Sequence, residues 1–537
     1  MESEREKRKL EAVLKQFEAQ GQEKKARMPK VTVPSGVWTE GVVKGKTFRP
    51  TAEEFEDPMR YLKSIAAEAG RYGVVRIRPP KSFARSTVFQ PECQTKDKLF
   101  STRVQKIRSK VLLDQKRSVA WQIELETARR NSFEEIRQLA KTTHALRLGK
   151  DPGHTKARTV EQLFWTSIAE HETFQVQYAS DVEGSFCSAG QFGKWDLRSI
   201  SSLPGGLLRF IDFNIPGVNS PMLYLGVLFS MFGWHHEDNE LYSISFLHRG
   251  APKTWYGIPG ARADAFRDLV DSKVLPKMRN AQPNTDVLAL KTTMVSPSAV
   301  ARAGIPISRL RQRAGDFIVT FPTAYHCGFS HGFTVAEAVN LALPDWLPCG
   351  VHSVARYRSM ARLSVLDLER LIITAGAEGI GGNALERLVS WQRDALASLR
   401  AMEVPMTAMS EENKLYLVLC RVCKHILHLC QVGCDCHPEE AYCAEHASEC
   451  ECPHRRAVLR YTQAHMDSLV PSGAAVAQAQ QLRLELPKGD ADTFLFGEAP
   501  SAEHPSPFRA MSAGAPASSK GSSYTVSRSV SPSASTS

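Results

Sequence analysis

The chain has 537 residues, 42% hydrophobic and 23% charged, a balance that suits a globular protein with a sizeable core. No apolar run approaches the roughly eighteen residues that a membrane-spanning helix needs, and the charged start is unlike a secretory signal. The composition therefore argues against a membrane protein and predicts a soluble intracellular one, with roughly three or four domains for this length. The net charge of +11 is spread unevenly along the chain.

Two segments precede the central part of the chain. Residues 1–45 are expected to form a charged N-terminal arm, with a short amphipathic helix as the alternative because apolar residues recur at helical spacing. Residues 46–87 predict a small ordered unit, in which Thr51 caps a helix with Glu54 three residues later and residues 72–77 have the pattern of a strand. Such a unit is too small to be stable alone, so we expect it to pack against a larger domain.

The excess positive charge lies mostly in residues 88–159, which we predict to be a basic helical linker. Residues 103–158 contain 14 Lys and Arg against 6 Asp and Glu. A solvated helical surface would explain this charge, and contact with nucleic-acid phosphate is the alternative. A helix over 160–169 and a strand over 174–178 are expected next.

Residues 160–348 are rich in strand-forming residues with Gly and Pro turns, and they contain a candidate metal site. The pentapeptide WHHED and a third histidine, His326, supply two imidazoles and a carboxylate, the set that holds iron(II) and leaves positions open for an oxidant and a co-substrate. Residues two apart on a strand share a face, so Glu237 can share a metal with His235 but not easily with His236. The sequence therefore predicts an iron-dependent oxygenase if these three side chains meet.

Helix-like sequence follows from 349 to 415, with helix expected over 357–402, where Leu363, Leu366, Leu368 and Leu371 supply an apolar face. A cysteine-rich segment extends from 416 to 470. Eight of the twelve cysteines lie between Cys420 and Cys452. Without a secretory signal, thiolates two or three residues apart predict zinc binding and not disulfides. A closed tetrahedral site has no open position, so its zinc is expected only to fold a small module. Residues 487–537 are rich in Ser, Ala, Pro and Gly and are expected to be disordered.

Seven of these cysteines and one histidine suffice for two tetrahedral zinc ions once Cys430 is set aside. His425, His428, Cys430 and His437 remain alternative ligands, and the spacing does not decide which ligands share an ion. The predicted zinc ligands are Cys420, Cys423, Cys434, Cys436, Cys443, His446, Cys450 and Cys452.

Several motifs, taken in order, resemble a known family. FRPTAEEFEDP at 48–58 and YGVVRIRPP at 72–80 resemble a JmjN segment. PMLYLG at 221–226, GAPKTWYGIP at 250–259 and AEAVN at 336–340, together with WHHED, resemble the JmjC domain of histone lysine demethylases. The cysteine-rich segment resembles the double zinc finger of JARID-type and related plant demethylases. The match covers roughly three quarters of the chain, which chance occurrence of short motifs does not explain.

The resemblance implies a mainly β catalytic core, a cupin-like JmjC jelly roll with about eight strands in two sheets. Flanking α-helices, a small zinc-binding module and disordered termini complete this expectation. By position in the motif, the iron ligands correspond to His235, Glu237 and His326.

The resemblance also assigns a pocket beside the iron. Lys253 matches the lysine that pairs with the distal carboxylate of 2-oxoglutarate, a group that would be costly to bury unpaired. Tyr178 matches a tyrosine that helps this lysine, and Phe232 matches an aromatic wall, although either residue alone would more often belong to a core. Positions around the methylammonium group of the substrate are matched by Gly217, Tyr224 and Ala338.

The same resemblance implies the reaction. It is Fe(II)- and 2-oxoglutarate-dependent hydroxylation of N-methyl groups on tri- or dimethylated lysine of histone H3, with release of formaldehyde and succinate. The branch that acts on H3 lysines 9 and 36 has a zinc ligand where this chain has Leu290, and leucine cannot bind a metal. Lysine 4 is therefore the predicted target. The implied partners are the methylated H3 tail and the nucleosome, with non-specific DNA contact through the basic linker, no membrane, and a nuclear location.

Ser245 departs from the family pattern. The family has asparagine there, whose amide contacts 2-oxoglutarate near the iron, and Ser330 and Thr334 also replace amide-bearing residues. One lost hydrogen bond costs on the order of 1–3 kcal/mol, or roughly 5- to 150-fold in affinity. The alternatives to a lysine 4 demethylase are thus a catalytically weak or inactive JmjC chromatin scaffold, a demethylase of another histone lysine (9 or 36), and a JmjC hydroxylase of a non-histone protein.

Overall fold

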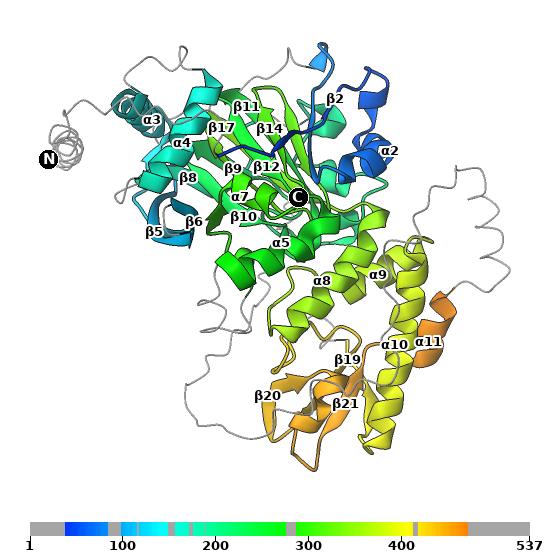
Figure 1. The fold of residues 1–537 in the computed structure, drawn as a ribbon. Coiled ribbons are helices and arrows are strands. Elements are labelled where there is room, and N and C mark those ends of the chain that lie inside the picture. Colours follow the sequence, from blue (N-terminus) through cyan, green and yellow to red (C-terminus); the bar gives the residue numbers. More distant parts are fainter. Residues whose placement is uncertain are drawn as a thin grey trace, which may run out of the picture. The chain divides into compact units, whose positions relative to one another are not determined.

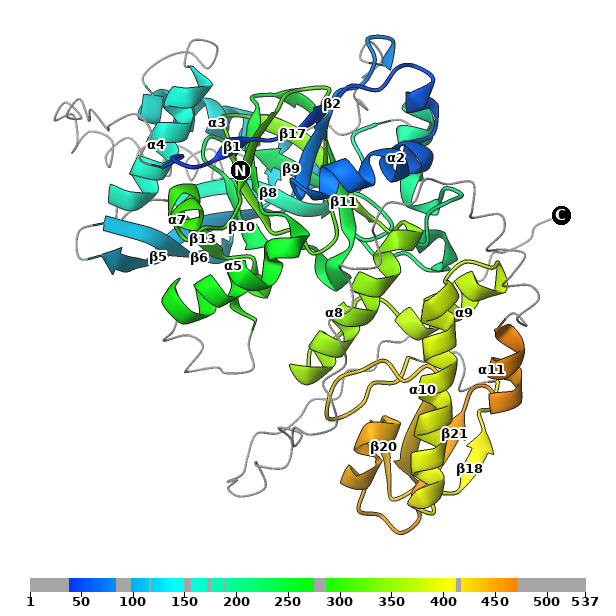
Figure 2. The same cartoon turned by 45° about the vertical axis from the view of Figure 1, so that its right-hand side comes forward.

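Figures 1 and 2 show the fold as a computed structural model in two views. The chain divides into two compact units, one ending at Trp346 and one beginning at Leu347. No helix in the described part of the chain is long and apolar enough to cross a membrane. The predicted tail and most of the predicted N-terminal arm lie outside the described residues, which are 38–83, 98–114, 117–148, 156–170, 175–187, 190–274, 286–411 and 417–470.

The first unit contains a five-stranded and a ten-stranded β-sheet that share one apolar core, with Trp234 and Phe329 from the smaller sheet and Leu225 and Val335 from the larger. This arrangement confirms the predicted jelly-roll core. Across the smaller sheet the strands are β1 (Val43–Lys44), β14 (Ser308–Gln312), β12 (Lys253–Gly257), β16 (His326–Ser330) and β10 (Met231–His235). Across the larger they are β13 (Thr293–Val295), β6 (Arg117–Thr127), β5 (Thr102–Asp114), β8 (Gln175–Glu183), β9 (Met222–Gly226), β17 (Thr334–Leu341), β11 (Tyr242–Gly250), β15 (Phe317–Thr320), β3 (Val74–Ile77) and β2 (Thr47–Phe48).

The N-terminal ordered unit packs against this core as expected. Thr51 and Glu54 form a reciprocal capping box, with hydrogen bonds of 2.8 and 3.1 Å, although the turn that they cap is a short 3-10 helix, η1 (Glu54–Glu56). Helix α2 (Pro58–Gly70) follows, and β3 then pairs antiparallel with β15, which extends the larger sheet. The last residues of the predicted arm join the edge of the smaller sheet, since β1 pairs parallel with β14.

The prediction of helices over residues 103–127 is wrong. These residues form the hairpin strands β5 and β6, which run antiparallel and continue the larger sheet. In β6, Trp121, Ile123 and Leu125 alternate with polar residues, a period of two that indicates a strand and was hidden by the density of charge. Helices begin only at α3 (Phe133–Leu148) and α4 (Ala157–Glu170).

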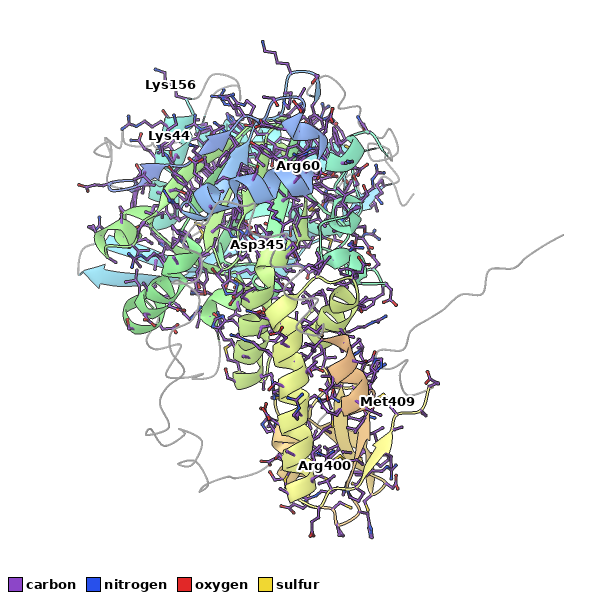
Figure 3. All side chains as sticks on the ribbon, turned by 90° about the vertical axis from the view of Figure 1, so that its right-hand side faces the viewer. Lys44, Arg60, Lys156, Asp345, Arg400 and Met409 are labelled. Carbon is purple, nitrogen blue, oxygen red and sulfur yellow. The ribbon has the colours of Figure 1, made fainter. Side chains whose placement is uncertain are left out.

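Figures 1 and 2 show α3 and α4 at one end of the first unit and α2 at the other. Tyr242 donates a 2.7 Å hydrogen bond to Asp345, labelled in Figure 3, which fixes the chain close to the end of this unit. The remaining elements are β4 (Leu99–Phe100), β7 (Asn131–Ser132), α5 (Ala263–Leu269), α7 (Pro297–Arg302), the π-helical turn η9 (Val270–Val274), and the 3-10 turns η4 (Gly193–Trp195), η5 (Ile200–Ser202), η6 (Leu208–Phe210), η7 (Asp238–Glu240), η8 (Gly260–Arg262), η10 (Val287–Leu290) and η11 (Pro344–Trp346).

The second unit joins helices and the cysteine-rich segment through one core. Ala395, Leu396 and Leu399 of α10 pack with Val432 and Ala457 of the small sheet, so the helical segment and the zinc module are not separate bodies. Arg400, labelled in Figure 3, lies in the last turn of α10. The elements are α8 (Leu347–Ser359), α9 (Leu368–Ala377), α10 (Gly382–Ala401), η13 (Ala444–Glu449), α11 (Gln463–Leu469) and a sheet in the order β18 (Met406–Ala408), β21 (Arg456–Leu459), β19 (Cys430–Cys434), β20 (His437–Tyr442).

The predicted helical stretch from 357 to 402 is interrupted. Residues 360–367 are not helical, Ala361 has a positive φ of 50°, and Asp367 caps the start of α9 by accepting from the Arg370 N–H. Leu363, expected on the apolar face, is 51% exposed in this connection. The leucine spacing was helical, but the backbone turns between α8 and α9.

Candidate functional site

A cavity of about 290 Å³ opens in the first unit and is lined by strands of both sheets. It collects most of the predicted site residues although they are far apart in sequence. Those that line it are Tyr178, Tyr224, Phe232, His235, Glu237, Ser245, Lys253, His326 and Ala338.

His235, Glu237 and His326 converge at this cavity, with candidate ligand atoms within 4.8 Å of one another. β10 ends at His235, which is the pairing partner of His326 at the start of β16, and the two imidazole centroids are 4.3 Å apart. Glu237 keeps an extended backbone (φ −67°, ψ 156°), so its side chain returns to the face of His235. Its Oε1 lies 3.4 Å from His326 Nε2.

Backbone carbonyls orient both imidazoles. Nδ1 of His235 lies 2.7 Å from the Gly233 oxygen and Nδ1 of His326 lies 3.1 Å from the Ala324 oxygen. Each Nδ1–H therefore donates to a carbonyl and leaves Nε2 as the nitrogen that can bind a metal, the arrangement that fixes tautomer and ring orientation in metal sites.

The protonation states of these groups suit metal binding. Burial, with the neighbouring charge of His326, holds the pKa of His235 well below its usual value. Burial alone would raise the pKa of Glu237, but hydrogen bonding and charge from His326 outweigh it and hold this pKa well below the usual range. A neutral imidazole and an ionised carboxylate are the forms that bind iron(II), so the donor set fits this metal.

His236 lies outside this group. Its Nδ1 is 2.9 Å from the Glu237 backbone oxygen, and its ring packs edge-on against Tyr325 at 4.9 Å between centroids. Strand alternation sends it away from the metal side, which is why the neighbouring histidine and not this one faces His326.

Lys253 is buried on β12 and its Nζ lies 5.5 Å from the centroid of the Tyr224 ring. Within the described chain it has no carboxylate partner, and burial lowers its pKa to about 8. A buried cation that faces a cavity favours an anionic ligand. Burial also raises the pKa of Tyr178 to about 12, so its phenol stays neutral and can donate a hydrogen bond to such an anion.

The position of Ser245 explains why its identity matters. It is buried on β11, and its partner across the ladder with β17 is Ala338. Two small side chains thus face one another at the cavity wall. Ser330 and Thr334, which also stand in place of amides, lie 3.3 Å apart between their hydroxyl oxygens and satisfy one another.

Gly217 is not among the described residues that line the cavity, so its expected place beside the methylammonium group stays a prediction. It sits in a turn with a positive φ of 84°, donates its N–H to the Ser220 oxygen at 2.8 Å, and accepts from the Asn340 N–H. Tyr224, by contrast, lines the cavity and donates to Asp181 at 3.3 Å.

Several lining residues were missed at the level of sequence. Trp255 packs against Phe232 with ring centroids 4.6 Å apart, and it could have been found because it lies two residues after Lys253 on the same strand face. Two ion pairs at the mouth of the cavity were also missed, Arg103 with Asp181 at 3.5 Å and Lys291 with Asp238 at 3.2 Å. The apolar lining residues that were missed are Ile123, Leu125 and Leu290.

The cysteine-rich segment brings together two groups of candidate zinc ligands. Cys420, Cys423, Cys443 and His446 form one group, and Cys434, Cys436 and Cys452 form the other. The first ligand pair along the chain, Cys420 and Cys423, thus lies with the third pair, Cys443 and His446. The two groups therefore interleave in sequence. Arg358 of α8 donates to Cys443 Sγ at 3.6 Å, a favourable partner for a thiolate.

The alternative ligands separate into two kinds. His425 lies 2.8 Å from Glu369 and His428 lies 2.8 Å from Asp367, so both imidazoles are engaged by carboxylates. His437 stays beside the second group, with Nδ1 3.8 Å from Cys434 Sγ. The fourth ligand of that group is Cys450, as predicted, or His437.

A third cluster, Cys187, His248 and Glu337, is fully buried in the first unit. Cys187 Sγ lies 3.5 Å from His248 Nδ1, whereas Glu337 Oε2 lies 3.3 Å from His248 Nε2. One imidazole offers only one ring nitrogen to a given metal ion, whereas Cys187 and Glu337 lie next to different ring nitrogens of His248. The geometry favours a buried polar cluster over a metal site.

Comparisons with known proteins agree with the motifs. Residues 46–79 match the model of the jmjN domain, 222–341 that of the JmjC domain, hydroxylase, and 420–469 that of the C5HC2 zinc finger. The order of five cysteines, one histidine and two cysteines in that last description coincides with the order of the eight predicted ligands.

Similar proteins include three from plants. The chain is 37% identical over 357 residues to "Lysine-specific demethylase JMJ706" of Oryza sativa subsp. japonica, covering 65% of this chain and 41% of the relative. It is 35% identical over 351 residues to "Lysine-specific demethylase REF6" of Arabidopsis thaliana (58% and 25%) and 30% identical over 504 residues to "Lysine-specific demethylase JMJ703" of Oryza sativa subsp. japonica (78% and 40%). It spans less than half the length of each. The chain therefore contains JmjN, JmjC and C5HC2 zinc finger domains, in that order.

Proposed function

We propose that the chain is an Fe(II)- and 2-oxoglutarate-dependent demethylase of tri- and dimethylated lysine in histone H3, with lysine 4 as the target. The observation that carries this proposal is the convergence of His235, Glu237 and His326 in a cavity that also contains the buried cation of Lys253. The relatives named lysine-specific demethylases support it. Leu290, which cannot bind a metal, supports lysine 4 over lysines 9 and 36.

Iron(II), when bound, supplies dioxygen activation for hydroxylation of an N-methyl carbon. His235, Glu237 and His326 would hold the ion through the Nε2 atoms of the two imidazoles and the carboxylate. The Lys253 ammonium pairs with the distal carboxylate of 2-oxoglutarate and the Tyr178 hydroxyl donates to it, while Phe232 excludes water beside them.

The methylated lysine enters beside Tyr224. A quaternary ammonium has no N–H to donate, so an aromatic ring and a nearby carboxylate suit it better than hydrogen-bond acceptors alone. Tyr224 and Asp181, hydrogen-bonded at 3.3 Å, provide both, and the small Ala338 leaves room. One oxygen atom of dioxygen would enter the methyl group, which then leaves as formaldehyde, and the other would enter succinate, formed from 2-oxoglutarate with release of carbon dioxide.

Mass spectrometry tests this function. Histone H3 peptides trimethylated at lysine 4, 9, 27 or 36 are incubated with the chain, iron(II), ascorbate and 2-oxoglutarate, and loss of methyl groups is expected at lysine 4. Demethylation at lysine 9 or 36 without lysine 4 would refute the target. Absence of turnover on every peptide would favour an inactive chromatin scaffold, and 2-oxoglutarate turnover on other proteins alone would favour a hydroxylase.

We further propose two structural zinc ions, a nuclear location and nucleosome binding aided by DNA contact through the basic linker. Arg129 and Arg130 are exposed in this segment, before α3. Contact with phosphate makes affinity depend on salt, so neutralising both arginines should weaken DNA binding and flatten its salt dependence. Unchanged salt dependence would refute the DNA contact.

The affinity for 2-oxoglutarate should fall at alkaline pH. Burial lowers the pKa of Lys253 to about 8, and only the protonated amine attracts a carboxylate, so the pairing is complete below this pH and lost above it. We expect kcat/KM for 2-oxoglutarate to be level up to pH 7 and to drop about tenfold per pH unit well above 8. Lys253→Arg serves as the control, because a guanidinium stays charged and should remove this drop. An unchanged drop in the variant would contradict the assignment.

Replacing Ser245 with asparagine should strengthen co-substrate binding. Ser245 lines the cavity and faces the small Ala338, so the longer amide has space to reach 2-oxoglutarate. One regained hydrogen bond lowers KM for 2-oxoglutarate by roughly 5- to 150-fold. Ser245→Thr, which adds a methyl group without an amide, should not reproduce the gain. A KM that is equal or higher in Ser245→Asn would show that serine already serves the co-substrate.

A further inference from the structure

Gln312 of β14 lies behind the wall of the iron cavity. Its side chain is fully buried, and it is not among the described residues that line the cavity, but it contacts two that are. Gln312 Oε1 accepts from Trp255 Nε1 at 3.0 Å, and Gln312 Nε2 donates to the backbone oxygens of Ser245 at 3.0 Å and Asp316 at 3.1 Å. An indole N–H can only donate and a carbonyl can only accept, so these partners fix the orientation of the amide.

This amide links the two sheets at the cavity. Gln312 and its ladder partner Lys253, on β12, belong to the smaller sheet, as does Trp255. Ser245 is on β11 of the larger sheet, and Asp316 directly precedes β15 of the same sheet. Gln312 therefore lies beside three residues of the cavity wall, Lys253 through the ladder and Trp255 and Ser245 through its side chain.

The Asp316 end of this link is fixed by charge. Asp316 is buried, and its two carboxylate oxygens accept from Arg78 Nε at 2.9 Å and from the second Arg78 guanidinium nitrogen at 3.3 Å. The Arg313 N–H also donates to this carboxylate at 2.9 Å. A two-bond pair of arginine and carboxylate has a specific geometry. Arg78, within the residues that match the jmjN model, thus anchors the strand end to which Gln312 is bonded.

The contacts of Gln312 favour an effect on the co-substrate pocket over an effect on the iron ligands. Trp255 packs against Phe232, with ring centroids 4.6 Å apart, and its ring centroid lies 6.0 Å from that of His326. A turn of the indole would therefore change the wall beside Lys253. The imidazoles of His235 and His326 are oriented instead by the backbone oxygens of residues 233 and 324. Gln312 bonds to neither imidazole.

We propose that Gln312 is a positioning residue that holds Trp255 and the Ser245 backbone in the arrangement that binds 2-oxoglutarate. It acts through these two residues and does not itself touch the co-substrate. The inference rests on the proposed function, because it takes the pocket beside Lys253 to be the 2-oxoglutarate site. A buried amide whose oxygen and nitrogen are both bonded cannot be replaced by an apolar side chain without freeing these partners.

Calorimetric binding tests this role without requiring turnover. Gln312→Met keeps the length of the side chain and removes its donor and acceptor. When 2-oxoglutarate is titrated into the iron(II)-loaded chain without oxygen, we expect the variant to bind it about tenfold more weakly, the effect of roughly one buried hydrogen bond. Its iron(II) affinity should stay within about twofold of the parent value, which also shows that the variant is folded. The matched control is Gln392→Met, because Gln392 is a buried glutamine of α10 that donates to the Tyr461 oxygen in the second unit. It should leave both affinities unchanged.

A second substitution tests the route through the indole. Trp255→Phe removes the N–H that Gln312 accepts. If Gln312 acts through Trp255, the two substitutions together should weaken 2-oxoglutarate binding by less than the product of their separate effects. Independent effects, whose product equals that of the double variant, would contradict this route.

Unchanged 2-oxoglutarate affinity in Gln312→Met would overturn the positioning role. An equal loss of iron(II) and 2-oxoglutarate affinity would also overturn it, because Gln312 would then support the fold in general. Demethylation by the same chains separates the two proposals. A selective loss of 2-oxoglutarate affinity in Gln312→Met, with no demethylation by the parent, supports the positioning role and contradicts the demethylase. Demethylation with the same KM for 2-oxoglutarate in parent and variant supports the demethylase and contradicts the positioning role. A parent chain that does not bind 2-oxoglutarate would refute both.

Discussion

The His235→Ala variant is expected to lose at least about 100-fold in iron(II) affinity and in demethylation, since changes to groups that only orient a metal ligand already cost roughly 10- to 100-fold. His235 is held by its 2.7 Å contact with the Gly233 oxygen and faces His326 across the β10–β16 pair. Alanine removes one of the three proposed protein ligands and leaves the Glu237 carboxylate beside a single imidazole. Iron content after anaerobic loading, measured with turnover on a trimethylated peptide, checks both effects.

His236→Ala is the matched control. This histidine is the next residue along the chain and is similarly buried, but its ring contacts Tyr325 and its Nδ1 contacts the Glu237 backbone oxygen. We expect iron binding to persist, with a loss of stability of about 1–3 kcal/mol from the vacated space. A variant pair in which His236→Ala loses iron and His235→Ala retains it would refute the assignment of ligands.

The pairing of Glu237 with His235 in the candidate iron site could be predicted because it depends on local geometry. Alternation along an extended backbone places Glu237 with His235 whatever the rest of the fold does, and Glu237 remains extended beyond the end of β10. The position of His326 followed only from the ordered motifs. Its meeting with His235 is a pairing between strands ninety-one residues apart, which spacing alone does not give.

The mouth of the cavity could not be predicted, because it is built from β5 and β6. The many charged residues of both segments favoured a prediction of helices, although the alternation of apolar and polar residues in β6 indicated a strand. Tertiary contacts determine that these segments form strands. β6 pairs with β13, and Gln105 of β5 exchanges hydrogen bonds with the backbone of Met231. Arg103, Leu125 and Leu290 therefore reach the site by contacts that no local pattern encodes.

The zinc module, too, could be predicted from the sequence in part. The ligand types and their spacing predicted a zinc site, because two thiolates close in sequence can share one ion. Spacing did not reveal that the pair Cys420 and Cys423 lies with the pair Cys443 and His446. It also did not reveal that α10 supplies part of the core beside β19 and β21. We therefore expect the helices to depend on zinc, since α10 and the small sheet bury apolar residues against one another.

Replacing Cys443 with serine should therefore unfold much of the second unit. Cys443 Sγ lies 3.0 Å from His446 Nδ1 and 3.9 Å from Cys423 Sγ, so its loss disrupts the first group of ligands. Zinc binding contributes about 10–16 kcal/mol in isolated fingers, as much as the whole stability of a typical domain of about 5–15 kcal/mol. We expect a lower zinc content by native mass spectrometry and the loss of one calorimetric transition. The transition of the first unit should remain, because the jelly-roll core has no residue in this module.

Cys349→Ser is the control, because Cys349 is a partly buried cysteine of α8 that belongs to neither ligand group. It should keep the zinc content and both transitions of the parent chain. The same measurement decides the fourth ligand of the second group. Cys450→Ser should release a zinc ion that His437→Ala retains if the predicted ligand is correct, and the reverse result would assign His437. Full zinc content in Cys443→Ser would contradict the interleaved pairing, because the first group would then need no third cysteine.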